Sequence, residues 1–181
     1  MNETMSLIVV KKTGSVVGAV TCNAPAELTP ESVAGKGLLV RGFLDLSGTP
    51  TVRVEQFVVP ADELEIFVTD FDQLIGFAPR SYFVEEINGK KEVKKVSGNS
   101  PTITLTDSQV TIAATPLVTQ DTDVWIQIEG GPLTSPRVYR DQIKKDNQNV
   151  AVVLDRILDP GRYVAIASIP GRPIRVDSFN L

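Results

Sequence analysis

The sequence predicts an all-β protein built from antiparallel β-sandwich modules, two of them in tandem. Glycine and proline residues recur at short intervals, and between them apolar residues follow a period of two, which is the pattern of a strand with one buried face. The predicted strands do not alternate with helical segments, which argues against an α/β fold. About thirteen or fourteen short strands are expected, which is more than one sheet usually holds and fits two sandwiches.

The length and composition are those of an ordinary globular protein. A chain of 181 residues can bury about 70% of its unfolded surface, so it needs no stabilising crosslinks. A hydrophobic content of 42% and a charged content of 22% argue against disorder and against a membrane span. The single cysteine, Cys22, excludes an intrachain disulfide, and its apolar neighbours predict a buried, unreactive thiol.

The first half of the chain is read as strands, with one short helix. Thr29 followed by Pro30 predicts the start of that helix, because threonine caps helices and proline suits the first turn. Asn88-Gly89 supplies the two positive φ angles of a type I′ turn and marks the clearest hairpin. The segment 70–80 is expected to be irregular and rich in aromatic residues. The predicted strands are residues 7–11, 16–22, 38–46, 51–59, 64–68, 81–87 and 90–96.

Residues 97–101, with the sequence SGNSP, predict a linker between two domains. Glycine, asparagine, serine and proline concentrate there, and the alternating pattern restarts afterwards. We therefore expect an N-terminal β domain over residues 1–99 and a C-terminal β-sandwich domain over residues 100–181.

In the second half, the strand pattern is clear except in one segment. Residues 133–148 leave two alternatives open. Ser135-Pro136 could open a short helix that continues to Lys145, or Val138-Tyr139 could belong to an edge strand. The other predicted strands are residues 103–105, 110–114, 123–129, 150–154, 163–169 and 174–179.

The sequence LDPGRY at residues 158–163, followed by an alternating apolar stretch, resembles the L-x-P-G-x-Y corner of immunoglobulin-like and fibronectin-III-like domains. The resemblance covers residues 150–181 and implies that the Tyr163 hydroxyl bonds the backbone a few residues upstream. The residues that carry this structural corner are Leu158, Pro160, Gly161 and Tyr163. The resemblance implies an immunoglobulin-like architecture for the C-terminal domain, and such sandwiches host many unrelated functions.

The sequence contains no motif that predicts a catalytic site. The chain contains no histidine, which excludes a Ser-His-Asp triad and histidine-ligated metal sites. Neither a G-x-S-x-G motif nor a P-loop occurs. Paired carboxylates such as Glu85-Glu86 are more often a solvated strand face than an acid–base pair. We therefore expect a protein that is not an enzyme and needs no cofactor.

Two D-x-D pairs, Asp70/Asp72 and Asp121/Asp123, lie in predicted loops. Carboxylate oxygens in loops suit calcium. Neither pair continues into an EF-hand pattern, and Asx turns explain such aspartates without an ion. The expectation is no metal site, with calcium left open as an alternative.

Four lysines, Lys90, Lys91, Lys94 and Lys95, lie on the hairpin that Asn88-Gly89 closes. Lysines on an edge strand protect it from aggregation, and they also suit an acidic partner surface. A nucleic-acid site would interleave aromatic side chains with the basic ones, which this hairpin does not do. The net charge of −4 also argues against nucleic acid as a partner.

The only tryptophan, Trp125, lies in a strand that alternates clearly. Val124, Ile126 and Ile128 share one face, so Trp125 shares the other face with the polar side chains of Gln127 and Glu129.

Either a second layer of the same protein covers Trp125 or the strand presents it to a partner. Phe67 also lies on the polar side of its strand, and Tyr139 lies in a polar segment. We predict an interface with another protein chain through these aromatic residues, with the polar ones as its rim. The candidate interface residues are Trp125, Gln127, Glu129, Phe67, Tyr139 and the four hairpin lysines.

Two classes of function fit these features. One is a structural protein that assembles with copies of itself or with neighbours, and the alternative is a carbohydrate- or ligand-binding module. The N-terminal segment has no basic region, and its apolar run of about four residues is too short for a signal peptide, which favours synthesis and retention in the cytoplasm. A phage-like virion component, of the capsid-decorating or tail kind, meets that condition because it assembles in the host cytoplasm. We expect self-association or a symmetric assembly, with no membrane contact.

Overall fold

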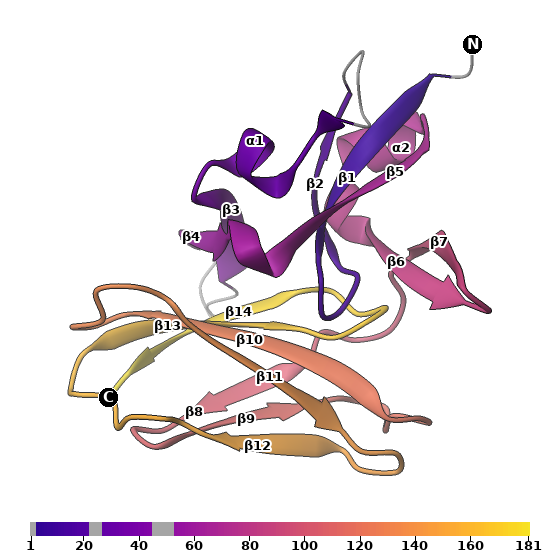
Figure 1. Ribbon diagram of the computed structural model, residues 1–181. Coiled ribbons are helices and arrows are strands. Elements are labelled where there is room, and N and C mark those ends of the chain that lie inside the picture. Colours follow the sequence, from indigo (N-terminus) through magenta and orange to yellow (C-terminus); the bar gives the residue numbers. More distant parts are fainter. Residues whose placement is uncertain (1–2, 22–26, 45–52) are drawn as a thin grey trace.

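The computed structural model describes residues 3–21, 27–44 and 53–181. Fourteen strands in five antiparallel sheets make up most of this part of the chain, which confirms the predicted all-β fold. Figure 1 shows two lobes, an N-terminal lobe that holds β1–β7 and a C-terminal lobe that holds β8–β14. Every strand pair among the described residues lies within one lobe or the other.

The C-terminal lobe is a sandwich of two sheets. The three-stranded sheet has the order β12-β9-β8 and comprises β12 (Asn149–Val153), β9 (Gln109–Ala113) and β8 (Thr102–Leu105). The four-stranded sheet has the order β11-β10-β13-β14 and comprises β11 (Arg137–Ile143), β10 (Thr122–Gly130), β13 (Arg162–Ser168) and β14 (Arg175–Asn180). Apolar side chains from both sheets meet in one core, to which β10 contributes Val124, Ile126 and Ile128.

The segment left ambiguous by the sequence is an edge strand. β11 pairs with β10 along its whole length, from Thr122 opposite Ile143 to Ile128 opposite Arg137. A polar segment can take this place because an edge strand needs only one paired side and keeps the other in solvent. The helical alternative is therefore wrong.

The N-terminal lobe is built on the three-stranded sheet β2-β1-β5, formed by β2 (Val16–Val20), β1 (Thr4–Val10) and β5 (Leu64–Asp70). Two hairpins flank it, β3 (Gly37–Leu44) with β4 (Arg53–Pro60) and β6 (Tyr82–Ile87) with β7 (Lys90–Lys95). The short helices are α1 (Pro30–Ala34) and α2 (Gln73–Phe77), with 3₁₀ turns η2 (Ala61–Glu63) and η3 (Pro79–Ser81). In the described part of the chain no helix is long and apolar enough to cross a membrane.

Several local signals of the sequence act as predicted. The Thr29 hydroxyl accepts a hydrogen bond from the backbone N–H of Ser32 at 3.1 Å, which begins α1 with a capping box. Asn88 and Gly89 have φ angles of 53° and 77°, as the type I′ turn between β6 and β7 requires. Cys22, with its predicted buried thiol, lies outside the described residues.

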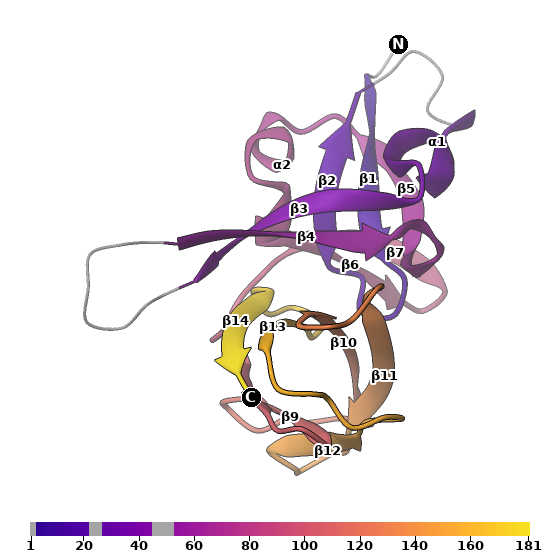
Figure 2. The same ribbon diagram turned by 90° about the vertical axis from the view of Figure 1, so that its left-hand side faces the viewer.

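The two lobes share an apolar cluster, which we call the junction core. From the N-terminal lobe it takes buried residues of β1, β4 and β5, such as Ile8, Phe57 and Leu64, and from the C-terminal lobe it takes Trp125, Ile166 and Val176. Figure 2 shows the β3–β4 hairpin crossing in front of β1 and β2, above the sandwich. The predicted boundary near residue 99 thus separates two sets of paired strands, but an apolar core continues across it. Whether the lobes fold as independent domains stays a prediction.

The structural corner predicted at residues 158–163 closes one end of the sandwich. Tyr163, the second residue of β13, has a fully buried side chain, and its hydroxyl donates a hydrogen bond to the carbonyl oxygen of Asp159 at 2.7 Å. Gly131 makes room for the ring, because a Cβ at Gly131 would lie only 2.4 Å from Cζ of Tyr163. Leu158 is buried, Pro160 is exposed, and Gly161 exchanges two backbone hydrogen bonds of 3.0 Å with Leu181.

We expect Tyr163→Phe to lower the free energy of unfolding by about 1–2 kcal/mol, because the Asp159 carbonyl loses its partner at a part-buried site. Chemical denaturation followed by circular dichroism measures this loss. Tyr139→Phe is the matched control, since the Tyr139 hydroxyl makes its hydrogen bond at an exposed position and should cost clearly less. Equal unfolding curves for Tyr163→Phe and the parent would show that the corner bond contributes nothing.

Candidate functional site

Trp125 lies inside the molecule, with only 1% of its surface exposed. The N-terminal lobe covers its face of β10, and the indole Nε1 donates a hydrogen bond to Oε2 of Glu63 in η2 at 3.0 Å. The prediction that this strand presents Trp125 to another chain is therefore wrong. The covering layer expected as the alternative is present, and it comes from the same chain.

Glu63 is the centre of a polar cluster at the junction, which we call the Glu63 cluster (Glu63, Trp125 and Arg140). Arg140 lies opposite Trp125 on β11, so the ladder places both donors on one side of the sheet. Its Nε donates to Oε2 of Glu63 at 3.1 Å, and its Nη2 donates to Oε1. Glu63 is 4% exposed, so the Arg140 guanidinium neutralises a buried carboxylate through a bidentate ion pair.

Gln127 and Glu129 also face the N-terminal lobe rather than an outside partner. Gln127 is fully buried, and its Nε2 donates to the carbonyl of Val58 at 2.8 Å and to Oε2 of Glu129 at 3.1 Å. Its Oε1 has no hydrogen-bond partner among the described residues. Glu129 is half-buried. The prediction that these two side chains form an exposed interface rim is wrong, because β4 occupies their face.

Phe67 and Tyr139 are half-buried and pack against cores of their own lobes. The Tyr139 hydroxyl donates to Oδ1 of Asp155 at 2.6 Å. Burial and this hydrogen bond raise the pKa of Tyr139, and the same bond lowers the pKa of Asp155. Both aromatic residues thus pack within their own lobes. Any further role of Phe67 or Tyr139 at an interface with another chain stays a prediction.

The four hairpin lysines lie on the β6–β7 hairpin, which projects from the N-terminal lobe (Figure 1). Lys90, Lys91 and Lys95 are exposed, and Lys94 is half-buried. Lys91 pairs with Glu65 of β5 at 2.9 Å, and Lys94 pairs with Glu92 at 3.4 Å. Two of the four charges are thus matched within the lobe, and contact with an acidic partner stays a prediction.

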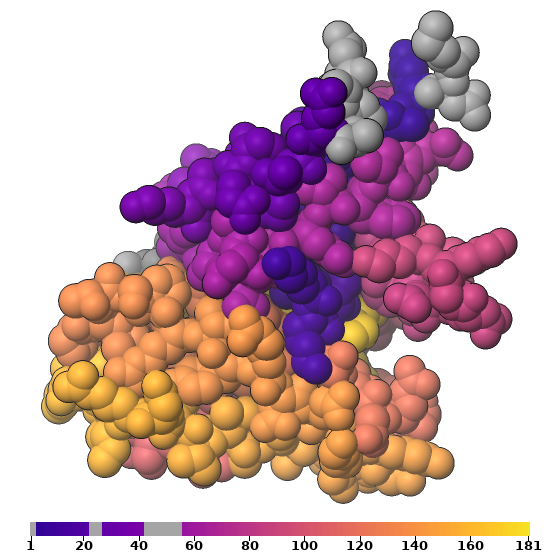
Figure 3. Space-filling view, in the orientation of Figure 1, coloured from indigo at the N-terminus to yellow at the C-terminus, as the bar shows by residue number. Residues whose placement is uncertain are grey.

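A charged groove of about 420 Å³ separates this hairpin from the sandwich, and Figure 3 shows the hollow between them. The β1–β2 turn and β5 of the N-terminal lobe form one side, and residues 120–123 form the other. Lys12 crosses the groove to pair with Asp123 at 2.7 Å. Beside it, the buried hydroxyls of Thr13, Ser15 and Ser168 bond one another, with two contacts of 2.7 Å. Lysine–aspartate and hydroxyl contacts therefore add to the apolar junction between the lobes.

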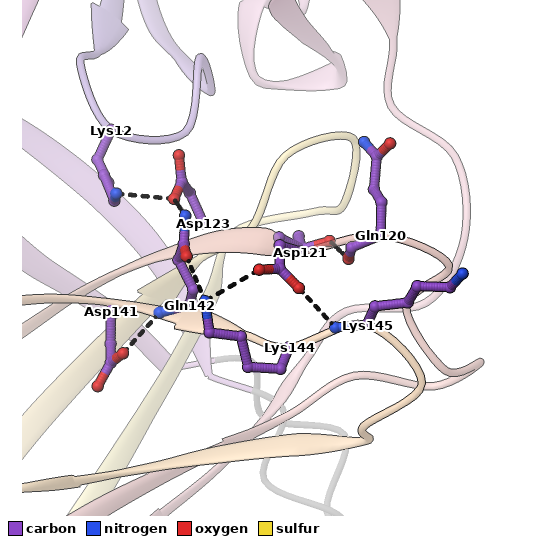
Figure 4. Close-up of polar contacts among 9 residues, drawn as sticks. Lys12, Gln120, Asp121, Asp123, Asp141, Gln142, Lys144 and Lys145 are labelled. Atoms are coloured by element: carbon purple, nitrogen blue, oxygen red, sulfur yellow. Dashed lines mark hydrogen bonds and ion pairs between the residues drawn. The ribbon is translucent and has the colours of Figure 1, made fainter.

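The Asp121/Asp123 pair is held by cations of the protein itself, as Figure 4 shows. Asp121 accepts from Nζ of Lys144 and from the backbone N–H of Lys145, each at 2.9 Å, and these bonds lower its pKa. Asp123 accepts from Lys12 and, at 2.8 Å, from Nε2 of Gln142. Each carboxylate thus has hydrogen-bond donors within the chain.

Asp72 of the other D-x-D pair caps α2 and accepts from the backbone N–H of Leu74 at 2.8 Å. Among the described residues no group of three or more Asp, Glu or Cys side chains comes together as a metal site would require.

Helix α2 lies at the end of the N-terminal lobe that points away from the sandwich (Figures 1 and 2). Large apolar side chains are exposed on and beside this helix. We call Phe71, Leu74 and Phe77 the apolar patch; their exposed fractions are 43%, 67% and 78%. Ile75 alone on this helix is buried, in the core beneath. A helix of five residues with one inward position leaves its other apolar side chains in solvent.

A hollow of about 350 Å³ borders the apolar patch. Met5 of β1 and the end of β2 line one side of it, and α2 lines the other side with Gly76 and the rim residue Phe77. The sequence predicts an irregular segment rich in aromatic residues at 70–80 and indicates no role for them. The aspartate cap at residue 72 and the i, i+3 spacing of Leu74 and Phe77 were the available signals.

Comparisons with known proteins leave the function open. No family model matches the chain, and a search of curated proteins finds no similar sequence. Among solved structures, the chain is similar to a superoxide reductase (neelaredoxin) from Ignicoccus hospitalis, with 13% sequence identity and a TM-score of 0.34. The match covers 45% of this chain and 77% of the reductase. A similarity at this level carries no argument about function.

Proposed function

We propose that this protein acts as a non-enzymatic assembly protein through contacts with other protein chains, and that the apolar patch is its contact surface. The observation that carries the proposal is the exposure of three bulky apolar side chains on and beside one short helix. Contiguous apolar surface is costly in water, and when it occurs on a folded protein it commonly marks an interaction site.

The chemistry of the patch suits a protein interface. Phenylalanine and leucine bury much apolar area on contact, and aromatic side chains are enriched at the centres of interfaces. Capping by Asp72 and burial of Ile75 hold α2 in place, so little conformational entropy is lost when a partner binds.

A virion component of the capsid-decorating or tail kind is the specific form of this function that we propose. It is supported by the histidine-free, cysteine-poor, β-rich chain and by the expected cytoplasmic synthesis. The alternative, a carbohydrate- or ligand-binding module, drew on the aromatic residues Trp125, Phe67 and Tyr139 as sugar contacts. With the indole buried at the junction, that side chain cannot stack on a sugar.

We expect Phe77→Asp to release the protein from its native assembly, because a charge within the apolar patch opposes burial of the patch against a partner. The measurement is sedimentation of the protein extracted from its native source, comparing the parent with the variant.

Val153→Asp is the matched control, since Val153 is 76% exposed on the C-terminal lobe against 78% for Phe77. It should remain in the assembly, and circular dichroism should show both variants folded. A Phe77→Asp chain that sediments with the parent assembly would contradict the proposal, and so would release by Val153→Asp alone.

A further inference from the structure

We infer that the partner of the apolar patch is a second copy of this chain, bound about a two-fold axis so that each Phe77 covers the hollow of the other copy. This inference rests on the proposed function and names the partner. Its evidence is the arrangement of a projection and a hollow side by side on one surface.

Self-complementarity is the first requirement of a two-fold contact, since one patch must fit a copy of itself. Phe77 stands on the rim of the hollow and is 78% exposed, so it projects beside a space that an aromatic ring can enter. Rotation by 180° about an axis near Phe77 places each ring over the opposite hollow. Phe71 and Leu74 then close the edges of the contact.

Gly76 also indicates that the hollow receives a side chain from a partner. Glycine inside a helix is unfavourable by about 1 kcal/mol relative to alanine. Among the described residues nothing requires glycine at this position, because the nearest atom to an added Cβ would be Cε of Met5 at 3.9 Å, an ordinary contact. Because Gly76 has no side chain, the hollow stays open, and a side chain from a partner can enter it.

Charge favours a second copy over a charged partner. Residues 73–78, with the sequence QLIGFA, carry no charged side chain. A two-fold contact brings each group near its own equivalent, so a neutral centre avoids repulsion between like charges. Asp72, at the edge, already accepts a hydrogen bond from Leu74 in the helix cap.

The surface is also held in position before binding. The backbone N–H of Phe71 donates to the carbonyl of Glu3 at 2.9 Å, and the N–H of Asp72 contacts Sδ of Met5 at 3.5 Å. These contacts tie the start of α2 to β1. Because the patch is small, we expect a weak dimer, with a dissociation constant of about 10–100 µM.

Sedimentation velocity of the purified chain, from about 1 µM to about 500 µM, tests the inference. We expect the parent to dimerise and Phe77→Asp to weaken the dimer about 30-fold or more, equivalent to about 2 kcal/mol. Gly76→Ala should weaken it about tenfold by filling the hollow, while the melting temperature stays equal or rises. Val153→Asp should dimerise like the parent.

A parent chain that stays monomeric throughout this range would overturn the second-copy inference. A dimer that persists in Phe77→Asp, or one unaffected by Gly76→Ala, would overturn it too, because the contact would then lie elsewhere. The proposed function fails separately, if Phe77→Asp remains in the native assembly. Release from that assembly by Phe77→Asp with a monomeric parent would mean that a different protein covers the patch.

Discussion

Trp125→Ala is expected to lower the free energy of unfolding by about 3–5 kcal/mol. The indole is 1% exposed and packs in the junction core between the two lobes, so its removal leaves a large cavity there. The change also takes one of the hydrogen bonds from the buried carboxylate of Glu63. Guanidinium denaturation followed by circular dichroism measures the loss, because the variant lacks the only tryptophan fluorophore.

Two controls separate burial from aromatic character. Phe77→Ala removes another large aromatic side chain at a site that is 78% exposed, and should change the free energy of unfolding by no more than about 0.5 kcal/mol. Trp125→Phe keeps most of the packing and should cost clearly less than the alanine variant. A Trp125→Ala protein as stable as the parent would contradict the placement of the indole in a shared core.

Arg140→Met is expected to lower the free energy of unfolding by about 3 kcal/mol, because it leaves the Glu63 carboxylate buried without its cation. Glu63 is 4% exposed, and among the described residues its carboxylate would keep only the bond from the Trp125 indole. The double variant Arg140→Met/Glu63→Gln should recover much of the loss, since the buried group is then neutral. Urea denaturation of the two single variants and the double variant completes the cycle.

Arg137→Met is the matched control on the same strand. Arg137 donates to the carbonyl of Arg156 at 2.9 Å, and its carboxylate neighbour Asp155 is exposed, so water replaces the lost contact more easily. The control should therefore be clearly more stable than Arg140→Met. Absence of recovery in the double variant would show that Arg140 acts through packing of its side chain and not through its charge.

β10 and the β6–β7 hairpin show what could be read from the sequence. Alternation with a period of two identifies a strand and its core face, because successive side chains of a strand point to opposite sides. Val124, Ile126 and Ile128 accordingly lie in the sandwich core. The type I′ turn at Asn88-Gly89 and the capping box at Thr29 depend on residues next to one another, so they too were predictable.

Segment 133–148 and α2 show the limit of local signals. Nothing within the polar segment decides between helix and strand, whereas pairing with β10 does. At α2 the apolar residues were visible in the sequence, but a helix of five residues has no period long enough to show which side chain points inward. Burial of Ile75 and exposure of Leu74 and Phe77 follow from how α2 packs on β1 and β2.

The all-β fold, the apolar face of each alternating strand and the positions of the tightest turns follow from the order of neighbouring residues, so the amino-acid sequence predicts them. The sequence also indicates that the polar face of β10 carries an indole beyond the apolar side chains that its core face needs, and this indole requires a cover. That the cover is Glu63 and the N-terminal lobe, 62 residues away along the chain, and that the exposed apolar surface lies at α2, depends on how distant segments pack together. The same apolar side chain is stabilised equally well by a layer of its own chain or by a partner, so burial against a distant segment cannot be read from local pattern.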